Sequence, residues 1–171
     1  MPERPLPLVL IGPMGSGKTK LGRRVAARLE LPFIDTDADV VAAHGPIHEI
    51  FASEGEAAFR AKERAAVAAA LRERAVVSLG GGAVLDLETQ GDLAGASVVL
   101  LHVDARTVAA RLGAAGARRP LLDGGGIETW TRIAAERKPV YDALADLVVD
   151  TNQGTAAQLA DLICDWWRND A

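Results

Sequence analysis

The 171-residue sequence predicts one α/β domain built around a parallel sheet. Short apolar runs alternate along the chain with segments of helical periodicity, and a glycine-rich loop separates the first expected strand from the first expected helix. Strands that alternate with helices are typical of parallel sheets, because parallel neighbours need a crossover connection. No repeat, low-complexity tract or linker divides the sequence, so we expect a single domain over residues 1–171.

Five apolar runs are expected to form the strands. They lie at Leu6–Ile11, Leu31–Asp35, Ala75–Leu79, Ser97–Val103 and Leu147–Val149. The fourth is the most apolar, with Val98, Val99, Leu100 and Leu101 at its centre. Runs of this kind are typical of strands buried on both faces of a sheet, which gives a three-layer αβα arrangement.

Helical periodicity appears between the first strands. The first helix is expected from Thr19 to Leu29, because Leu21, Val25 and Leu29 repeat every four residues. Apolar residues on both sides of Gly45-Pro46 indicate short helices that are interrupted at that pair. These apolar residues are Val40, Val41, Ile47, Ile50 and Phe51.

Longer helices are expected in the rest of the chain. Ser53 and Glu56 match a capping box, so a long helix should begin there and run to about Arg72. Two further helices are expected at Thr107–Leu112 and Thr129–Ala145. Pro139 would kink or break the second of them.

The last helix is expected to bury one apolar face. That face carries Leu159, Leu162, Ile163 and Trp166. Trp167 falls off this stripe, which leaves it either exposed or part of a dimer contact.

The composition excludes several function classes. The net charge of −4 gives no general attraction to nucleic acid, and no apolar run approaches the roughly 20 residues of a membrane span. The one cysteine, Cys164, cannot form an internal disulfide, and residues 1–5 lack the pattern of a signal peptide. We therefore expect a cytoplasmic protein with no nucleic-acid or membrane partner. A monomer is also expected, although no feature of the sequence fixes the oligomeric state.

The segment Gly12–Thr19, called the phosphate loop below, matches G-x-x-x-x-G-K-[ST] at every fixed position and lies between a strand and a helix. Its glycines let backbone N–H groups turn toward nucleotide phosphates, Lys18 reaches the β- and γ-phosphates, and the Thr19 hydroxyl is placed to coordinate Mg²⁺. The expected nucleotide-binding residues here are Gly15, Ser16, Gly17, Lys18, Thr19 and Lys20. The alternative is a glycine-rich turn without a ligand.

Two carboxylates follow the second expected strand, where ligands bind in open α/β sheets. Asp35 is expected to hold a water of the Mg²⁺ shell, and Asp37 to orient a substrate hydroxyl. The alternative is that they cap the next helix. Gly80, Gly81 and Gly82 follow the third expected strand and would let a ligand lie close to the backbone, although a plain turn is equally consistent.

Four arginines are candidates for binding anionic groups. Arg60 and Arg137 would clamp a substrate carboxylate if the fold brings them together, and either alone would be a surface charge. Arg119 lies in the long segment Gly113–Gly126, which suits a mobile lid that stabilises the transferring phosphoryl group. Arg111 would lie against an adenine ring, or would be a charge near a helix C-terminus.

Six sequence blocks, taken together, resemble the shikimate kinase family over nearly the whole chain. The blocks are Gly12–Thr19, Asp35–Asp37, Gly55–Arg60, Gly80–Gly82, Arg119–Leu122 and Glu136–Tyr141. The first is shared by many families, whereas the other five in this order are quite specific together. The resemblance implies the P-loop kinase fold of nucleoside monophosphate kinases, with a five-stranded parallel sheet and a mobile lid over about residues 113–126.

The resemblance also implies a reaction in the pathway to chorismate and the aromatic amino acids. The γ-phosphoryl group of ATP would pass to the 3-hydroxyl of shikimate, giving 3-phosphoshikimate and ADP, with Mg²⁺ as cofactor. It implies that Asp37, Arg60, Gly82 and Arg137 hold shikimate and that Phe51 and Phe59 wall the pocket. Lys18, Asp37 and Arg119 would be the catalytic residues, and Arg111 would stack on adenine.

Some positions depart from the family pattern. Lys20 stands where the family more often has a small hydroxyl residue, and it adds charge near the phosphates. Asn152–Thr155 occupies the place of the adenine-contact loop without the usual basic and proline residues.

Three rival functions are consistent with the phosphate loop alone. They are a gluconate kinase of the same fold, a nucleotide-binding switch without an acceptor, and a structural domain with a vestigial loop. The Arg60 and Arg137 pair argues against the first, Asp35–Asp37 and the arginine lid against the second, and the intact Lys18 and Thr19 against the third.

Overall fold

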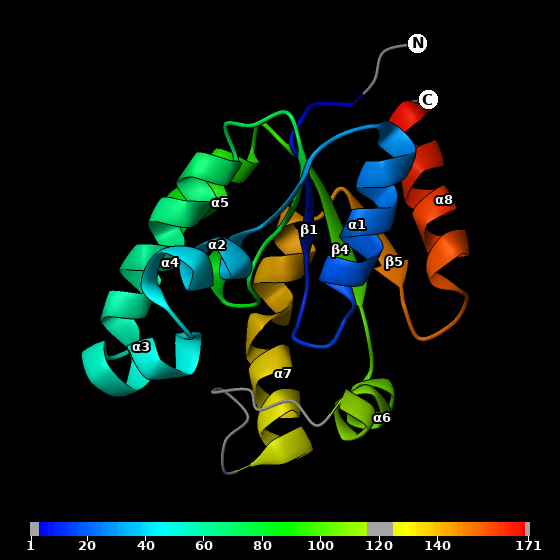
Figure 1. Cartoon of the computed structure of the whole chain (residues 1–171). Helices are drawn as coiled ribbons and strands as arrows, with labels where there is room; N and C mark the ends of the chain where they lie inside the picture. Colours follow the sequence, from blue (N-terminus) through cyan, green and yellow to red (C-terminus); the bar gives the residue numbers. More distant parts are fainter. Residues whose placement is uncertain (1–3, 116–124, 170–171) are drawn as a thin grey trace.

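Five parallel strands form the middle layer of the fold within residues 4–115 and 125–169, which are the residues that the computed structural model describes (Figure 1). In chain order they are β1 (Leu8–Ile11), β2 (Phe33–Asp35), β3 (Val76–Ser78), β4 (Ser97–His102) and β5 (Leu147–Asp150). Their order across the sheet is β2-β3-β1-β4-β5, and every neighbouring pair is parallel. The predicted five-stranded parallel sheet is therefore confirmed.

Helices connect the strands and cover the sheet. They are α1 (Lys18–Leu29), α2 (Thr36–His44), α3 (Ile47–Glu54), α4 (Glu56–Ala70), the 3-10 helix η1 (Ala83–Leu85), α5 (Leu87–Leu93), α6 (Ala105–Ala115), α7 (Gly126–Leu144) and α8 (Ala156–Arg168). α7 continues through Pro139, so the prediction that this proline could break the helix is wrong. None of the helices within the described residues is both long enough and apolar enough to span a bilayer.

The sheet is covered on both faces because successive side chains of each strand point to opposite sides. Leu8 and Leu10 of β1 lie in one core cluster, to which α1 and α8 contribute their apolar sides. Val9 and Ile11 lie in the other, together with side chains of α4, α5 and α7. Figure 1 shows these two sets of helices on opposite sides of the strands, which gives the expected three layers.

The buried face of α8 differs from the predicted one. Ala160, Ile163, Cys164 and Trp167 are buried, whereas Leu162 is 47% exposed. Trp167 packs in the core shared with α1, and Trp166 is half-buried with the Arg4 guanidinium 4.2 Å above its ring centroid. The prediction that Trp167 lies off the stripe is wrong, because the i, i+3, i+4, i+7 series that begins at Ala160 faces the sheet.

The start of α4 also differs from the predicted one. Ser53 belongs to the preceding helix, α3, where its hydroxyl donates to the Glu49 carbonyl at 2.7 Å. α4 begins after Gly55, which has a φ of +86° and makes the sharp turn between the two helices. The capping-box prediction is therefore wrong. α5 was not predicted; its N-cap Asp86 accepts a hydrogen bond from the Thr89 N–H at 2.8 Å.

Candidate functional site

Three loops meet at the carboxyl edge of the sheet because β2, β3 and β1 are neighbours. The phosphate loop follows β1, Asp35–Asp37 follows β2, and Gly80–Gly82 follows β3. The carboxyl ends of parallel strands share one edge, so residues far apart in the sequence come together there. This edge holds the predicted phosphate site and the predicted acceptor site.

The phosphate loop has the backbone of an anion-binding turn. Gly17 has a φ of +91° and caps α1, so the positive end of that helix faces the loop. Lys18 Nζ donates to the carbonyls of Gly12 at 2.8 Å and Pro13 at 3.1 Å. The Ser16 hydroxyl is buried and has no hydrogen-bond partner among the described residues. A buried polar group of this kind suits a bound ligand such as phosphate.

Thr19 and Asp35 join the phosphate loop to the loop after β2. The Thr19 hydroxyl donates to Asp35 Oδ2 at 2.8 Å, while Asp35 Oδ1 accepts the N–H groups of Asp37 and Ala38. Asp35 therefore caps α2, as the alternative for this residue predicted, and Asp37 lies in the first turn of the same helix. A hydroxyl and a carboxylate are oxygen donors of the kind that Mg²⁺ prefers.

The Thr19 hydroxyl and the Asp35 carboxylate fit an Mg²⁺ ion that is also bound by the phosphates of a nucleotide. Within residues 4–115 and 125–169, no group of three or more His, Cys, Asp or Glu side chains could hold a metal by itself. Mg²⁺ characteristically keeps several waters and binds through one or two protein oxygens plus substrate phosphates. Thr19 and Asp35 match that pattern.

A cavity of about 290 Å³, called the acceptor pocket below, lies beside the phosphate loop. Its lining includes all the residues that were predicted to hold the acceptor: Asp37, Phe51, Phe59, Arg60, Gly80, Gly81, Gly82 and Arg137. The rings of Phe51 and Phe59 lie 4.9 Å apart and form an apolar wall. Met14 of the phosphate loop also lines the pocket, so the two predicted substrate sites are contiguous.

Each glycine of the run Gly80–Gly82 leaves room for a charged side chain. A Cβ at position 80 would lie 2.6 Å from Asp37 Oδ1, and one at position 82 would lie 2.6 Å from both terminal nitrogens of Arg60. A Cβ at position 81 would lie 3.2 Å from Arg137 Nη1. The absence of side chains on this run therefore lets one carboxylate and two guanidinium groups converge on the acceptor pocket.

Glu63 belongs to the site but was not predicted from the sequence. It is 4% exposed, lines the acceptor pocket, and accepts a hydrogen bond from Arg60 Nη1 at 2.8 Å. Burial raises the pKa of its carboxyl above the ordinary value, Asp37 adds to this, and Arg60 opposes it. Arg60 and Glu63 are three residues apart on one helix, and this spacing could have predicted that the two side chains pair.

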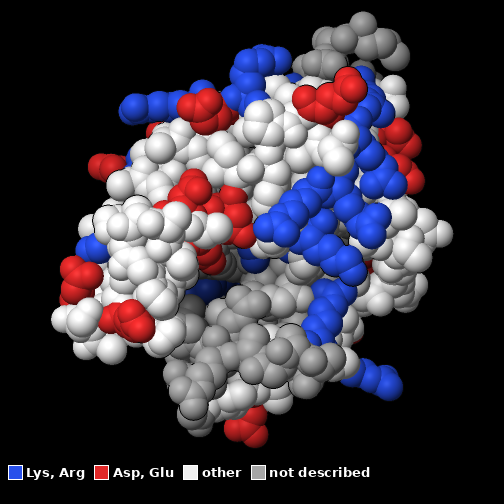
Figure 2. Space-filling view, viewed as in Figure 1, with Lys and Arg blue, Asp and Glu red and all other residues white. Residues whose placement is uncertain are grey.

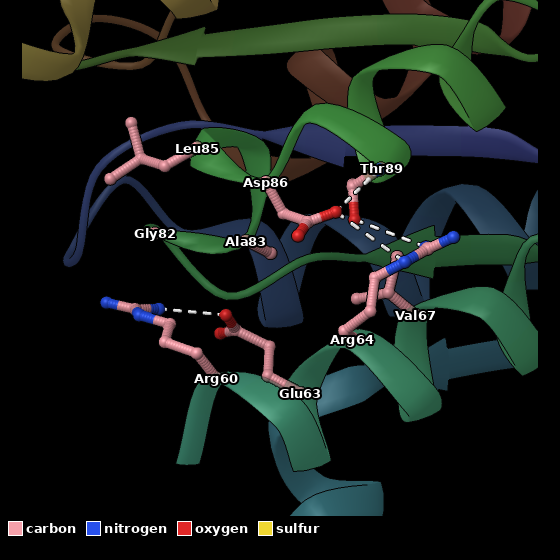
Figure 3. A pocket seen from close by; sticks show the side chains of 9 residues that line it. All are labelled: Arg60, Glu63, Arg64, Val67, Gly82, Ala83, Leu85, Asp86 and Thr89. Atoms are coloured by element: carbon pink, nitrogen blue, oxygen red, sulfur yellow. Dashed lines mark hydrogen bonds and ion pairs between the residues drawn. The ribbon is translucent and has the colours of Figure 1, made fainter. Parts of the chain in front are cut away.

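Arg60 and Glu63 also line a second cavity, of about 250 Å³, which shares them and Gly82 with the acceptor pocket (Figure 3). Arg64 also lines this cavity and donates to Asp92 Oδ2 at 2.6 Å and to Glu88 Oε2 at 3.2 Å. Figure 3 shows the Arg60–Glu63 pair on one side of this cavity and Arg64 with Asp86 and Thr89 on the other. Because Glu63 holds the guanidinium of Arg60, it fixes one wall of the acceptor pocket.

Helix α7 contributes buried side chains to the acceptor pocket and to the phosphate loop. Arg137 is 9% exposed and lines the acceptor pocket. One helical turn further on, the Tyr141 hydroxyl donates to the Gly81 carbonyl at 2.5 Å, and burial raises the pKa of this phenol. Near the start of the helix, Trp130 Nε1 donates to the Met14 carbonyl at 2.7 Å. No role was predicted for Trp130 or Tyr141 from the sequence.

A larger cavity of about 670 Å³ lies on the other side of the phosphate loop. Ser16, Gly17, Lys20 and Arg111 line it, all of which were predicted to contact the nucleotide. Arg111 Nη1 and Nη2 donate to the carbonyls of Gly15 at 2.7 Å and Thr151 at 2.8 Å. Arg111 does not lie in the last turn of α6, so its alternative role as a charge at that helix end is wrong. Stacking on adenine remains a prediction.

The segment Asn152–Thr155 borders this cavity through Gly154, and the first turns of α8 add Ala156 and Leu159. Basic side chains gather over α1, beside the phosphate loop (Figure 2). Lys20, Arg23 and Arg24 of α1 are exposed there. A positive surface beside the loop favours the approach of an anionic nucleotide. Arg119 and residues 116–124 of the predicted lid lie outside the described residues.

Comparison with known proteins identifies relatives over nearly the full chain. A family model described as shikimate kinase matches residues 14–168. A shikimate kinase of Thermobifida fusca (strain YX) is 46% identical over 165 residues, which is 95% of each chain. One of Salinispora tropica (strain CNB-440) is 49% identical over 154 residues, covering 89% of this chain and 92% of the relative.

A solved structure supports the same relationship. The structure of a shikimate kinase from Acinetobacter baumannii in complex with shikimate superposes with a TM-score of 0.87 at 32% identity. The match covers 92% of this chain and 90% of that one.

Proposed function

The chain belongs to the shikimate kinase family, and we propose that it transfers the γ-phosphoryl group of ATP to the 3-hydroxyl of shikimate, giving 3-phosphoshikimate and ADP. One observation carries the proposal beyond family membership. Asp37, Arg60 and Arg137 converge on one cavity that adjoins the phosphate loop. Two guanidinium groups suit a carboxylate and Asp37 suits a ring hydroxyl, so the acceptor is a small hydroxylated acid.

The reaction requires alignment and charge neutralisation more than covalent chemistry from the protein. Lys18, which now bonds to loop carbonyls, is placed to turn to the phosphates, and the Gly17 end of α1 adds positive potential. Arg60 and Arg137 would fix the carboxylate, while Asp37 would orient the attacking hydroxyl. Arg119 would add charge from the lid, as the family resemblance implies.

Mg²⁺ is part of the proposal, with Thr19 as the direct protein ligand and Asp35 binding through water. When bound, Mg²⁺ neutralises charge on the β- and γ-phosphates. The hydrogen bond between Thr19 and Asp35 supports this assignment, since it places two hard oxygen donors next to the phosphate loop. Removal of the metal with excess EDTA is expected to abolish turnover, and added MgCl₂ to restore it.

We also propose a cytoplasmic monomer. The single cysteine supports a reducing compartment, because Cys164 is buried and has no disulfide partner in this chain. Sedimentation equilibrium of the purified protein tests the oligomeric state.

ADP release measured with purified protein, ATP and Mg²⁺ tests the activity. Shikimate is expected to stimulate release strongly, whereas gluconate and a no-acceptor control should give only background. Mass spectrometry should then find one added phosphoryl group on shikimate. Slow ATP turnover that shikimate does not change would favour a nucleotide-binding switch instead.

A further inference from the structure

Trp130 connects α7 to the phosphate loop. Its ring is 5% exposed and packs with Val103 and Val108, beside Met14. Its Nε1 donates to the Met14 carbonyl at 2.7 Å, across 116 residues of sequence. A buried indole N–H usually has a hydrogen-bond partner, and here that partner is a carbonyl of the phosphate loop.

The contact determines how one peptide group of the phosphate loop is oriented. A trans peptide is planar, and its C=O and N–H groups point in opposite directions. Because Trp130 holds the Met14 carbonyl, the Gly15 N–H of the same peptide points away from Trp130. Within the described residues this N–H donates to no acceptor, which is the state expected of a group reserved for a ligand.

Residue 15 is also the place where this peptide could most easily turn over. Reversing the Met14–Gly15 peptide changes ψ of Met14 and φ of Gly15, and glycine adopts φ values of either sign at little cost. Gly15 has a φ of +80° in the structure. Arg111 already fixes the following carbonyl, that of Gly15, so the Trp130 contact supplies the matching constraint on the preceding peptide.

We propose that Trp130 is a positioning residue for nucleotide binding: its indole N–H keeps the Met14–Gly15 peptide oriented so that the Gly15 N–H faces the phosphates. This inference rests on the nucleotide-binding half of the proposed function. Without the contact, the free loop spends less time in the competent orientation, and the apparent dissociation constant rises by that factor. Bound nucleotide selects the competent loop, so turnover at saturation changes little.

The test is calorimetric titration of ADP with Mg²⁺ into the wild-type protein, Trp130→Phe and Trp167→Phe. Trp167 is a matched control because it is 4% exposed and its Nε1 has no partner among the described residues. Trp130→Phe is expected to bind ADP about five- to tenfold more weakly, the effect of one lost hydrogen bond. Its kcat at saturating ATP and shikimate should stay within about twofold of the wild type. For Trp167→Phe, both the dissociation constant for ADP and kcat should stay within about twofold of the wild type.

Benzothienylalanine at position 130 provides a second variant if Trp130→Phe does not fold, because it keeps the bicyclic ring and lacks only the N–H donor. The same weakening of ADP binding is expected. Unchanged ADP affinity, or a lower kcat with unchanged affinity, would overturn the role of Trp130 while leaving the proposed function intact. A wild-type protein that binds no ADP would instead overturn the proposed function and this inference with it.

Discussion

Gly82 shows how a single missing side chain shapes the acceptor pocket. Its φ of −99° is accessible to any residue, so its backbone conformation does not require glycine. The requirement comes from space, since a Cβ there would lie 2.6 Å from both terminal nitrogens of Arg60. From the sequence alone, Gly80–Gly82 was equally consistent with a plain turn. The clash that excludes a side chain at position 82 involves Arg60, which belongs to another element, so it could not be predicted from the glycine run itself.

Gly82→Ala is therefore expected to displace Arg60 without unfolding the protein. The obstructing atoms are at the end of a flexible side chain, so the melting temperature should change little. The KM for shikimate should rise roughly tenfold or more, because small displacements of a binding group are costly. Gly91→Ala is the control, since apart from its chain neighbours and the backbone of its own helix no atom lies within 4 Å of a Cβ at that position. An unchanged KM for shikimate in Gly82→Ala would contradict the steric argument.

Glu63 makes a pH-dependent contribution to stability. Burial raises the pKa of its carboxyl above the ordinary value of 4.5, so the folded protein binds a proton more readily than the unfolded chain. The stabilising contribution of this group is fully present below pH 4.5 and is lost as the pH rises through the folded pKa.

Glu63→Gln should remove that dependence, because the amide does not titrate. The free energy of unfolding of the wild type minus that of the variant is expected to fall as pH rises from 4.5, and then to level off. Urea denaturation at a series of pH values measures the difference. A difference that increases with pH over this window would mean that Arg60 lowers the pKa of Glu63 by more than burial raises it.

At the scale of elements, α8 illustrates where sequence periodicity fails. Two apolar series run along this helix, one through Leu162 and Trp166 and the other through Ile163 and Trp167. Both satisfy helical spacing, so the pattern cannot decide which faces the core. The strands were simpler to predict, because a strand buried on both faces is apolar at every position, as Leu8–Ile11 is.

Truncation of the two neighbouring tryptophans separates these alternatives. Trp167→Ala should lower the free energy of unfolding by about 3–5 kcal/mol, since it removes a buried ring and leaves a cavity. Trp166→Ala should cost about 1 kcal/mol, because that ring is only half-buried at the margin of the core, with the Arg4 guanidinium over it. Denaturant titrations of both variants give the comparison, and the reverse order would restore the predicted stripe.

α7 shows why contacts between elements were harder to predict than the elements themselves. The helix was predicted from Thr129 to Ala145, close to its observed bounds. Its contacts with Met14 through Trp130 and with Gly81 through Tyr141 depend on how the helix packs against the rest of the fold. No pattern within the sequence of the helix predicts that packing.

At the scale of the whole molecule, the strand order explains the arrangement of the site. Because β2, β3 and β1 are adjacent, the loops after them place the phosphate loop, Asp37 and the glycine run side by side. Arg60 and Arg137 reach the same place from α4 and α7. The residues of the acceptor pocket could be selected from their sequence blocks, but their convergence follows only from the sheet order and the helix packing.

The most direct test of this account is the steady-state KM for shikimate of Arg137→Ala at saturating ATP. Arg137 lines the acceptor pocket and would bind the carboxylate, away from the reacting hydroxyl. We expect the KM to rise about 100-fold, the loss of a charge-assisted contact of about 3 kcal/mol, with a much smaller change in kcat. A KM equal to that of the wild type would contradict the proposal that the two arginines clamp the acceptor.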